Sequence, residues 1–129
     1  MIRRLPSTYN AERLSWDDYF QAIAETVALR STCPRLHVGC VIVRDNRIVS
    51  TGYNGSPPRA AHCTEVGCLM VDGHCMRTIH AEENAVLQAI PKGVDLAECT
   101  IYCTYKPCSR CTALLRDNGI FRMRFPRVL

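Results

Sequence analysis

The hydrophobic and polar positions of the first forty residues predict one amphipathic helix. Its apolar side chains recur at helical spacing, so that they share one face. The helix is expected to begin at Ser15, because Asp18 three residues later completes an approximate capping box. It should end before Pro34, since the residue preceding a proline resists helical backbone angles. The apolar positions are Trp16, Tyr19, Phe20, Ile23 and Val27.

A strand hairpin is predicted after this helix. Residues 38–43 form an uninterrupted apolar run rich in β-branched side chains, which is typical of a strand covered on both faces. Asp45 and Asn46 predict a tight turn, and residues 48–52 predict the returning strand.

The last third of the chain alternates between helical and strand patterns. Good helix formers follow His80, and Pro107 is expected in the first turn of a further helix, which Asn118 and Gly119 end. The complete order is helix, strand, strand, helix, strand, helix, strand, which predicts an α/β domain. The expected helices are 80–90 and 107–116, and the expected strands are 99–104 and 120–125.

Between these two halves, residues 54–78 have no regular period. Glycine, proline, cysteine and histidine recur throughout this segment. A loop of this length is usually functional or pinned by a ligand.

The composition adds an unusual number of thiols. Nine cysteines occur among 129 residues, and an odd number cannot close completely into disulfides within one chain. The sequence has no apolar run like that of a signal peptide or a membrane span, so secretion and membrane insertion are not expected. Intracellular thiols stay reduced, so the cysteines indicate metal binding, chemistry or packing. A net charge of +4 is too mild to indicate nucleic-acid binding.

Cys108 and Cys111 form a Cys-x-x-Cys pair at the start of an expected helix. This spacing puts both sulfur atoms on one side of the first turn, where the helix N-terminus favours thiolates. Taken alone, the pair is compatible with a redox pair, half of a structural zinc site or part of a catalytic zinc site.

The triplet His80-Ala81-Glu82 favours the catalytic interpretation. A histidine and two thiolates make three protein ligands, which leave the fourth tetrahedral position of zinc for water. Glu82 is expected to reach that water rather than the metal. His-x-Glu followed by Pro-Cys-x-x-Cys is the signature of zinc nucleobase deaminases. The alternative is that His80 merely begins a helix and that the cysteines are core or structural.

Four stretches resemble the deoxycytidylate (dCMP) deaminase family of the cytidine deaminase-like superfamily. The His-x-Glu and Pro-Cys-x-x-Cys elements are shared across the superfamily, whereas the stretch 52–57 and the cysteine-rich segment before His80 resemble bacterial and phage dCMP deaminases. The resemblance runs from about Trp16 to Ile120. The stretches are Val38–Val43 (VGCVIV), Gly52–Pro57 (GYNGSP), His80–Ala85 (HAEENA) and Pro107–Cys111 (PCSRC).

The resemblance implies a three-layer α/β/α cytidine deaminase-like fold. Its mixed sheet has about four strands with helices on both faces, and the two helices that begin at the metal ligands share one face. Residues 15–129 are expected to form the catalytic domain after an N-terminal arm of residues 1–14. Family members usually continue beyond the position of Leu129, so the domain is expected to be C-terminally short.

The implied activity is the zinc-dependent hydrolysis of dCMP to dUMP and ammonia, which supplies dUMP for thymidylate synthesis. By this resemblance, zinc is held by His80, Cys108 and Cys111. Glu82 is then the catalytic residue that serves as base and acid.

Substrate contacts are implied by the same resemblance. Asn54 and the backbone amide of Ala81 are expected to bind the nucleotide, with an ordinary turn asparagine as the alternative for Asn54. The sequence does not choose among the candidate partners of the 5′-phosphate, which are Arg59, Arg77, Arg110 and Arg116.

A second, structural zinc is implied by the resemblance to bacterial and phage members. Cys33, Cys63 and His74 lie at offsets that resemble ligand positions in those members, and Cys68 is favoured as the fourth ligand over Cys75, which is adjacent to His74. Four protein ligands would close the site and pin the long segment. The alternative is a set of free thiols. The other cysteines outside the catalytic pair are expected to be small buried hydrophobes: Cys40, Cys99 and Cys103.

The resemblance also implies a homo-oligomer, with a hexamer favoured, and dCTP and dTTP as regulators. The expected location is the cytoplasm, or the host cytoplasm for a phage protein, with neither a membrane nor a nucleic acid as partner. The alternatives are a deaminase of another cytosine nucleotide or nucleoside, such as dCTP or deoxycytidine, and a tRNA adenosine deaminase. A non-catalytic zinc-bound module that senses nucleotides is the least favoured alternative.

Overall fold

A four-stranded mixed sheet forms the centre of the computed structural model, which describes residues 12–55, 70–71, 74–75 and 79–126. The strands lie in the order β2-β1-β5-β6. β1 pairs antiparallel with β2 and with β5, whereas β6 runs parallel to β5. The bounds are β1 Gly39–Arg44, β2 Arg47–Tyr53, β5 Thr100–Cys103 and β6 Arg122–Arg124.

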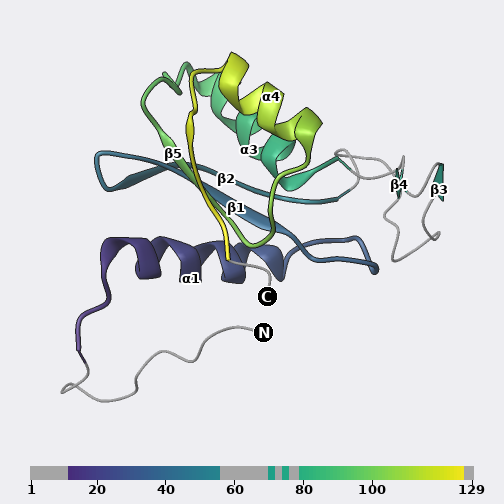
Figure 1. Ribbon diagram of the computed structural model, residues 1–129, viewed down its shortest axis with the longest axis horizontal. Coiled ribbons are helices and arrows are strands. Elements are labelled where there is room, and N and C mark those ends of the chain that lie inside the picture. The colour runs from purple at the N-terminus through teal and green to yellow at the C-terminus, as the bar shows by residue number, and fades with distance from the viewer. Residues whose placement is uncertain (1–11, 56–69, 72–73, 76–78, 127–129) are drawn as a thin grey trace.

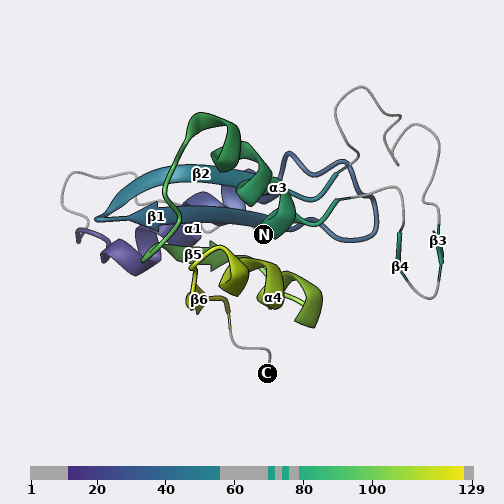
Figure 2. The same ribbon diagram turned by 90° about the horizontal axis from the view of Figure 1, so that it is seen from above.

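Helices cover both faces of this sheet (Figure 1). α1 lies on one face, and α3 and α4 lie side by side on the other, as Figure 2 also shows. This arrangement confirms the predicted three-layer fold and the shared face of the last two helices. The helices are α1 Trp16–Ala28, α3 Ala81–Ala89 and α4 Ser109–Asp117, and a 3₁₀ turn, η1, spans Ile90–Lys92.

The segment 54–78, for which no period is expected, contributes a second sheet. Its strands β3 (Met70–Val71) and β4 (His74–Cys75) pair antiparallel. Strands of two residues are too short to leave a periodic signal in a sequence. In the described part of the chain, no helix has the length and apolarity needed to cross a membrane.

The side chains of β1 alternate between two halves of the core. Cys40 and Ile42 belong to the cluster that packs under α3 and α4, while Val41 and Val43 pack with Phe20 of α1. All five are at most 5% exposed. The uninterrupted apolar run of this strand is thereby explained, because both of its faces are covered.

The turn predicted at Asp45 and Asn46 is confirmed. The φ angles of these two residues are 51° and 59°, as a type I′ hairpin turn requires. Asn and Asp adopt this left-handed conformation more readily than other non-glycine residues. Local chemistry therefore determines the hairpin.

α1 begins at the position that the capping box predicts, but it ends several residues before Pro34. The Ser15 Oγ accepts the backbone N–H of Asp18 at 3.1 Å. The helix stops at Ala28, and the chain then enters a loop in which the Thr32 N–H donates to the Asn54 carbonyl at 3.4 Å. The helix thus ends six residues before Pro34, so the proline does not set its end.

α4 begins two residues later than the sequence predicts. Pro107 lies outside the helix, so its predicted place in the first turn is wrong. Cys108 is the N-cap residue instead, because its sulfur accepts the backbone N–H of Cys111. A sulfur cap of this kind has no signal in helix propensities, which favour Ser, Thr, Asp or Asn at that position.

The end of α4 is a Schellman motif, as Asn118 and Gly119 predict. Gly119 has a φ of 88°, and the Ile120 N–H donates to the Leu115 carbonyl at 2.9 Å. Ile120 therefore belongs to the end of the helix and not to a strand. The last strand, β6, covers 122–124 rather than the predicted 120–125.

Candidate metal centre and active site

Two helix N-termini converge at the carboxyl end of β5. His80 is the N-cap residue of α3, Cys108 is the N-cap residue of α4, and Cys111 lies in the first turn of α4. His80 Nδ1 is 3.2 Å from the Cys111 sulfur and 3.7 Å from the Cys108 sulfur. The three potential ligand atoms all lie within 4.8 Å of one another. The structure therefore brings together the three residues that the sequence motif separates by 28 and 31 positions.

The place of α3 is determined by contacts with β2. The Ser50 hydroxyl donates to the Ala85 carbonyl at 2.6 Å, and this bond is buried. Asn84 Nδ2 donates to the Tyr53 carbonyl, also at 2.6 Å. These bonds tie the first two turns of α3 to the sheet, so the position of His80 depends on the β-strand beneath it.

An ion pair joins α3 and α4 close to the cluster. The Arg110 guanidinium lies 2.9 Å from Glu83 Oε1. Because Arg110 follows Cys108 by two residues and Glu83 follows His80 by three, this contact links the two ligand-bearing first turns.

The donor set fits a tetrahedral zinc ion. A nitrogen at about 2.0 Å and a sulfur at about 2.3 Å from zinc lie about 3.5 Å apart in that geometry. The observed separations of 3.2 and 3.7 Å bracket this value. Burial raises the pKa of the Cys111 thiol, and the Glu82 carboxylate raises it further. A thiolate at this position therefore needs a cation beside it, which a zinc ion provides.

Glu82 lies beside this cluster as a buried carboxylate. It is 4% exposed and its charge acts on Cys111. Its Oε1 is 3.5 Å from the Cys40 sulfur, which lies in turn 3.3 Å from the sulfur of Cys103. The chemistry available here is that of a proton acceptor held next to a metal position.

Cys40 and Cys103 are the residues that the sequence interpretation missed. Both are fully buried, as expected, but Cys40 also contacts the carboxylate, and Cys103 contacts Cys40. In the sequence, only the two-residue period of the strands points to their position, because it puts both residues on the sheet face that α3 covers. That period alone does not reveal which helix residue lies above them.

Asn54 has a structural role in the described part of the chain. Its Oδ1 accepts the Val38 N–H at 2.8 Å, and its Nδ2 donates to the Leu36 carbonyl at 2.6 Å. The next residue, Gly55, forms a β-bridge with Ile79, directly before His80. The bridge therefore brings the residue after Asn54 beside the residue before His80. Within the described residues, these two bonds use one amide hydrogen and one oxygen lone pair of the Asn54 side chain.

Ala81 is the first residue of α3 and is 1% exposed. Amide groups in the first helical turn have no carbonyl partner within the helix. Its N–H is therefore a donor next to His80.

The residues proposed for a second zinc are only partly described. Cys33 is 4% exposed in the loop after α1. His74 and Cys75 form β4, whereas Cys63 and Cys68 lie outside the described residues. Of the candidate phosphate partners, Arg59 and Arg77 also lie outside them.

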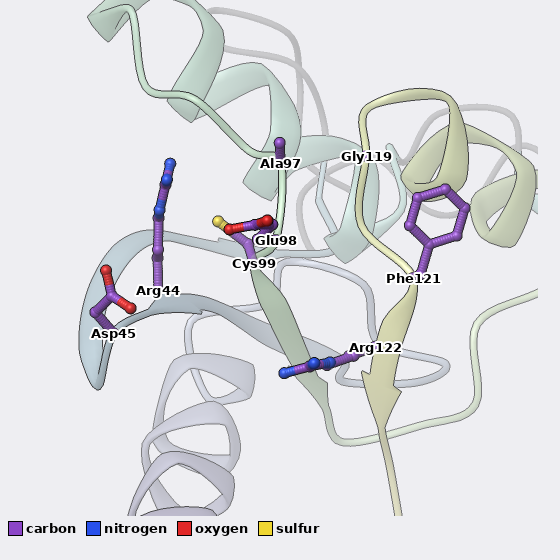
Figure 3. A pocket seen from close by; sticks show the side chains of 8 residues that line it. All are labelled: Arg44, Asp45, Ala97, Glu98, Cys99, Gly119, Phe121 and Arg122. Carbon is purple, nitrogen blue, oxygen red and sulfur yellow. The ribbon is translucent and has the colours of Figure 1, made fainter.

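A hollow of about 630 Å³ lies at the opposite end of the sheet (Figure 3). It opens where β1 ends and where β5 and β6 begin, whereas the metal cluster follows the end of β5. Two basic and two acidic side chains line it, so it has no net charge to attract a phosphate. These are Arg44, Arg122, Asp45 and Glu98. The cavity therefore does not form part of the candidate active site.

Comparison with known proteins agrees with this geometry. Residues 14–126 match the family described as the cytidine and deoxycytidylate deaminase zinc-binding region. ComE operon protein 2 of Bacillus subtilis is 52% identical over 109 residues, which cover 84% of this chain and 58% of that protein. The deoxycytidylate deaminase of Mycobacterium phage D29 is 39% identical over 127 residues, covering 89% and 97%. The chain thus spans little more than half of the Bacillus protein and nearly all of the phage protein.

The fold is also similar to that of a solved structure. The dCMP deaminase of cyanophage S-TIM5, in complex with dCMP and dUMP, superimposes with a TM-score of 0.75. Its sequence is 25% identical, and the match covers 84% of this chain and 78% of that one.

Proposed function

Because the chain belongs to the cytidine and deoxycytidylate deaminase zinc-binding family, we propose that it catalyses the zinc-dependent hydrolysis of dCMP to dUMP and ammonia. The observation that carries the proposal is the cluster of His80, Cys108 and Cys111 with the buried Glu82 carboxylate beside it. Two relatives support the choice of substrate. The phage D29 relative is a deoxycytidylate deaminase, and the cyanophage enzyme was solved with dCMP and dUMP.

In this proposal His80 Nδ1 and the two sulfurs hold one zinc ion. When bound, zinc supplies Lewis-acid activation of a water molecule. Three protein ligands leave a fourth position of the tetrahedron free for water, which is the catalytic rather than the structural pattern.

Glu82 moves two protons in the proposed reaction. Its carboxylate takes a proton from the water that attacks C4 and passes it to N3 of cytosine. It then transfers the second water proton to the amino group, which leaves as ammonia, while the water oxygen becomes the 4-carbonyl of dUMP. One carboxylate serves as base and then as acid, which requires that it stay in reach of all three positions.

For the nucleotide, we propose contacts with Ala81 and Asn54. The Ala81 N–H is suited to the cytosine carbonyl because it has no helical partner. Among the described residues, the Asn54 side chain has one donor and one acceptor beyond its two backbone bonds. Arg110 is engaged with Glu83, whereas Arg116 lines a surface hollow with Lys106 along α4. The 5′-phosphate is left without a single assigned partner.

We also propose a second, structural zinc on Cys33, Cys63, Cys68 and His74, with Cys75 as the rival to Cys68. Two observations support it among the described residues: Cys33 is 4% exposed, and His74 lies in β4, which pairs with β3. Metal analysis of the purified chain tests it: two zinc ions per chain are expected, and one ion per chain would remove this proposal.

From the same family relationship we also propose an oligomeric state and a cellular location for this chain. Large apolar side chains remain exposed on the single chain, including Phe121 at 70%, Leu29 at 58% and Trp16 at 51%. Their exposure supports a homo-oligomer, for which we favour a hexamer regulated by dCTP and dTTP. Light scattering with and without dCTP and dTTP measures the number of chains in the oligomer. Reduced thiol ligands favour the cytoplasm.

The substrate is tested by ultraviolet absorbance with dCMP, dCTP, deoxycytidine and CMP. We expect dCMP to have the highest kcat/KM. Turnover preferring dCTP or deoxycytidine would reassign the substrate, and turnover of none would favour a tRNA adenosine deaminase or a non-catalytic zinc module.

The role of Glu82 is tested by Glu82→Gln, with Glu83→Gln as the matched control. Glu82→Gln should keep zinc and lower kcat by about 10²- to 10⁴-fold. Glu83→Gln changes the adjacent carboxylate, which pairs with Arg110 at the helix surface, and should leave kcat within about fivefold. Wild-type turnover by Glu82→Gln would contradict the assignment.

A further inference from the structure

Two cysteines from distant parts of the chain face each other beneath the candidate active site. Cys40 of β1 and Cys103 of β5 are direct partners in the antiparallel ladder. Both are 0% exposed, and their sulfur atoms lie 3.3 Å apart. Neither forms a disulfide, so both are free thiols.

The ladder explains why these sulfurs are so close. The Thr104 N–H donates to the Gly39 carbonyl at 3.0 Å, so Gly39 and Thr104 form a hydrogen-bonded pair. Antiparallel pairs alternate, which makes Cys40 and Cys103 a non-hydrogen-bonded pair, the type in which side chains approach more closely.

The Cys40 thiol is oriented toward a functional group as well as toward Cys103. Its sulfur lies 3.5 Å from Glu82 Oε1, within hydrogen-bond range for a thiol. Burial raises the pKa of Cys40, and the contacts with Cys103 and Glu82 raise it further, so the thiol keeps its hydrogen. The S–H of Cys40 is the donor in this contact, and the Glu82 oxygen accepts it.

This donor matters because of where the carboxylate lies. A buried carboxylate without hydrogen-bond donors is costly, and a carboxylate free to rotate spends little time in the geometry that proton transfer needs. The contact with Cys40 engages one oxygen of Glu82 from the sheet side, opposite the helix to which Glu82 belongs.

We propose that Cys40 is a positioning residue for Glu82: its thiol holds Oε1 and thereby orients the carboxylate for proton transfer, while Cys103 holds the Cys40 side chain in place. The inference rests on the proposed deaminase function and deepens it. Cys40 touches neither the nucleotide nor the metal ligands in this proposal; it acts through Glu82.

The competing explanation is that Cys40 merely fills space in the core. Cys99 provides a matched control, because it belongs to the same core cluster and is 1% exposed. Its sulfur contacts the Asp95 carbonyl at 3.7 Å at the far end of β5. Cys99 also borders the hollow at the opposite end of the sheet, so its removal takes a sulfur from the same core cluster without touching Glu82.

The kinetic experiment compares Cys40→Ala, Cys40→Ser and Cys99→Ala in the zinc-loaded chain. Cys40→Ala should lower kcat for dCMP by about 10- to 100-fold, with KM and zinc content near wild type. Cys40→Ser keeps a hydrogen-bond donor and should recover most of kcat. Cys99→Ala should leave kcat within about twofold. Unchanged kcat in Cys40→Ala, or an equal loss in Cys99→Ala, would overturn the proposal. If Cys40→Ala does not fold, a loss of kcat in Cys40→Ser as large as that of Glu82→Gln would also overturn it.

A second readout does not depend on any substrate. The S–H stretching band of Cys40 is identified by infrared spectroscopy as the band lost in Cys40→Ala. It should lie below the frequency of a free thiol and should move in Glu82→Ala, while the Cys99 band stays. A Cys40 band unaffected by Glu82→Ala would overturn the contact. If the band moves but the wild-type chain does not deaminate dCMP, the proposed substrate fails and the contact stands.

Discussion

Gly52 of β2 lies directly against the backbone of Ala85 in α3, with no room for a side chain between them. A Cβ at Gly52 would overlap the amide of Ala85 and the carbonyl of Ala81. Both are backbone atoms of the helix that carries His80 at its N-cap, so neither can move alone. The distance between strand and helix is therefore determined by the absence of a side chain at this glycine.

Gly52→Ala should push α3 away from the sheet. We expect a loss of stability of about 1–3 kcal/mol, which is typical of overpacking against backbone. Since α3 carries His80, zinc affinity should fall as well. Urea denaturation and zinc titration with a competing chelator measure the two effects.

Gly39→Ala is the matched control for this prediction. A Cβ at Gly39 would overlap Ala24 and Ala28 of α1, on the opposite face of the sheet. It should cost similar stability and leave zinc affinity unchanged. Equal losses of zinc affinity in the two variants would show that α3 does not transmit the effect.

Metal removal should abolish activity reversibly. Chelation would take away the zinc ion that we propose Cys108 and Cys111 hold, and binding energy for a metal contributes to folding stability. We expect a lower Tm and loss of dCMP turnover, both restored by added zinc. In Cys111→Ser, added zinc should not restore the Tm or the turnover, because a hydroxyl is a poor zinc ligand. Restoration of turnover in Cys111→Ser by stoichiometric zinc would argue against its role as a ligand.

Tyr102 should make the protein sensitive to high pH. Burial, together with a hydrogen bond of 2.6 Å to Asp17 on α1, raises the pKa of this phenol to about 12. A raised pKa favours the neutral form in the folded state, so this contribution is complete below about pH 10 and is lost as the pH rises toward 12. Urea denaturation between pH 9 and about 12 should show a smaller decline for Tyr102→Phe than for wild type. Parallel declines would contradict the prediction.

Asn54→Ala should reduce both stability and substrate binding. Loss of the bonds to Val38 and Leu36 should cost about 1–3 kcal/mol at roughly 1 kcal/mol for each bond. KM for dCMP should rise, because Asn54 is proposed to contact the nucleotide. Asn118→Ala removes one side-chain bond at the end of α4 and should leave KM unchanged. An unchanged KM in Asn54→Ala would make Asn54 purely structural.

Short-range features of this fold are readable from the sequence. The capping box at Ser15, the turn at Asp45 and Asn46, and the helix end at Gly119 each depend on residues within a few positions. The sequence also indicates the ligand-bearing turns, because His-x-Glu and Cys-x-x-Cys are local motifs at helix N-termini. The prediction that Pro107 lies in the first turn of α4 was wrong because the N-cap residue is a cysteine, which is unusual at that position.

Contacts between distant segments required the tertiary structure. Cys40 and Cys103 are 63 positions apart, and the sequence identifies them only as buried strand residues. Pairing of β1 with β5 brings them together, and packing of α3 on the sheet sets Glu82 above them. Asn54 likewise bonds to Val38 only when the loop before β1 packs against the end of β2. Local patterns thus determine which elements form and which side chains can bind metal, because those depend on neighbouring residues. The strand register and helix packing decide what surrounds the candidate base, because those contacts depend on the whole core.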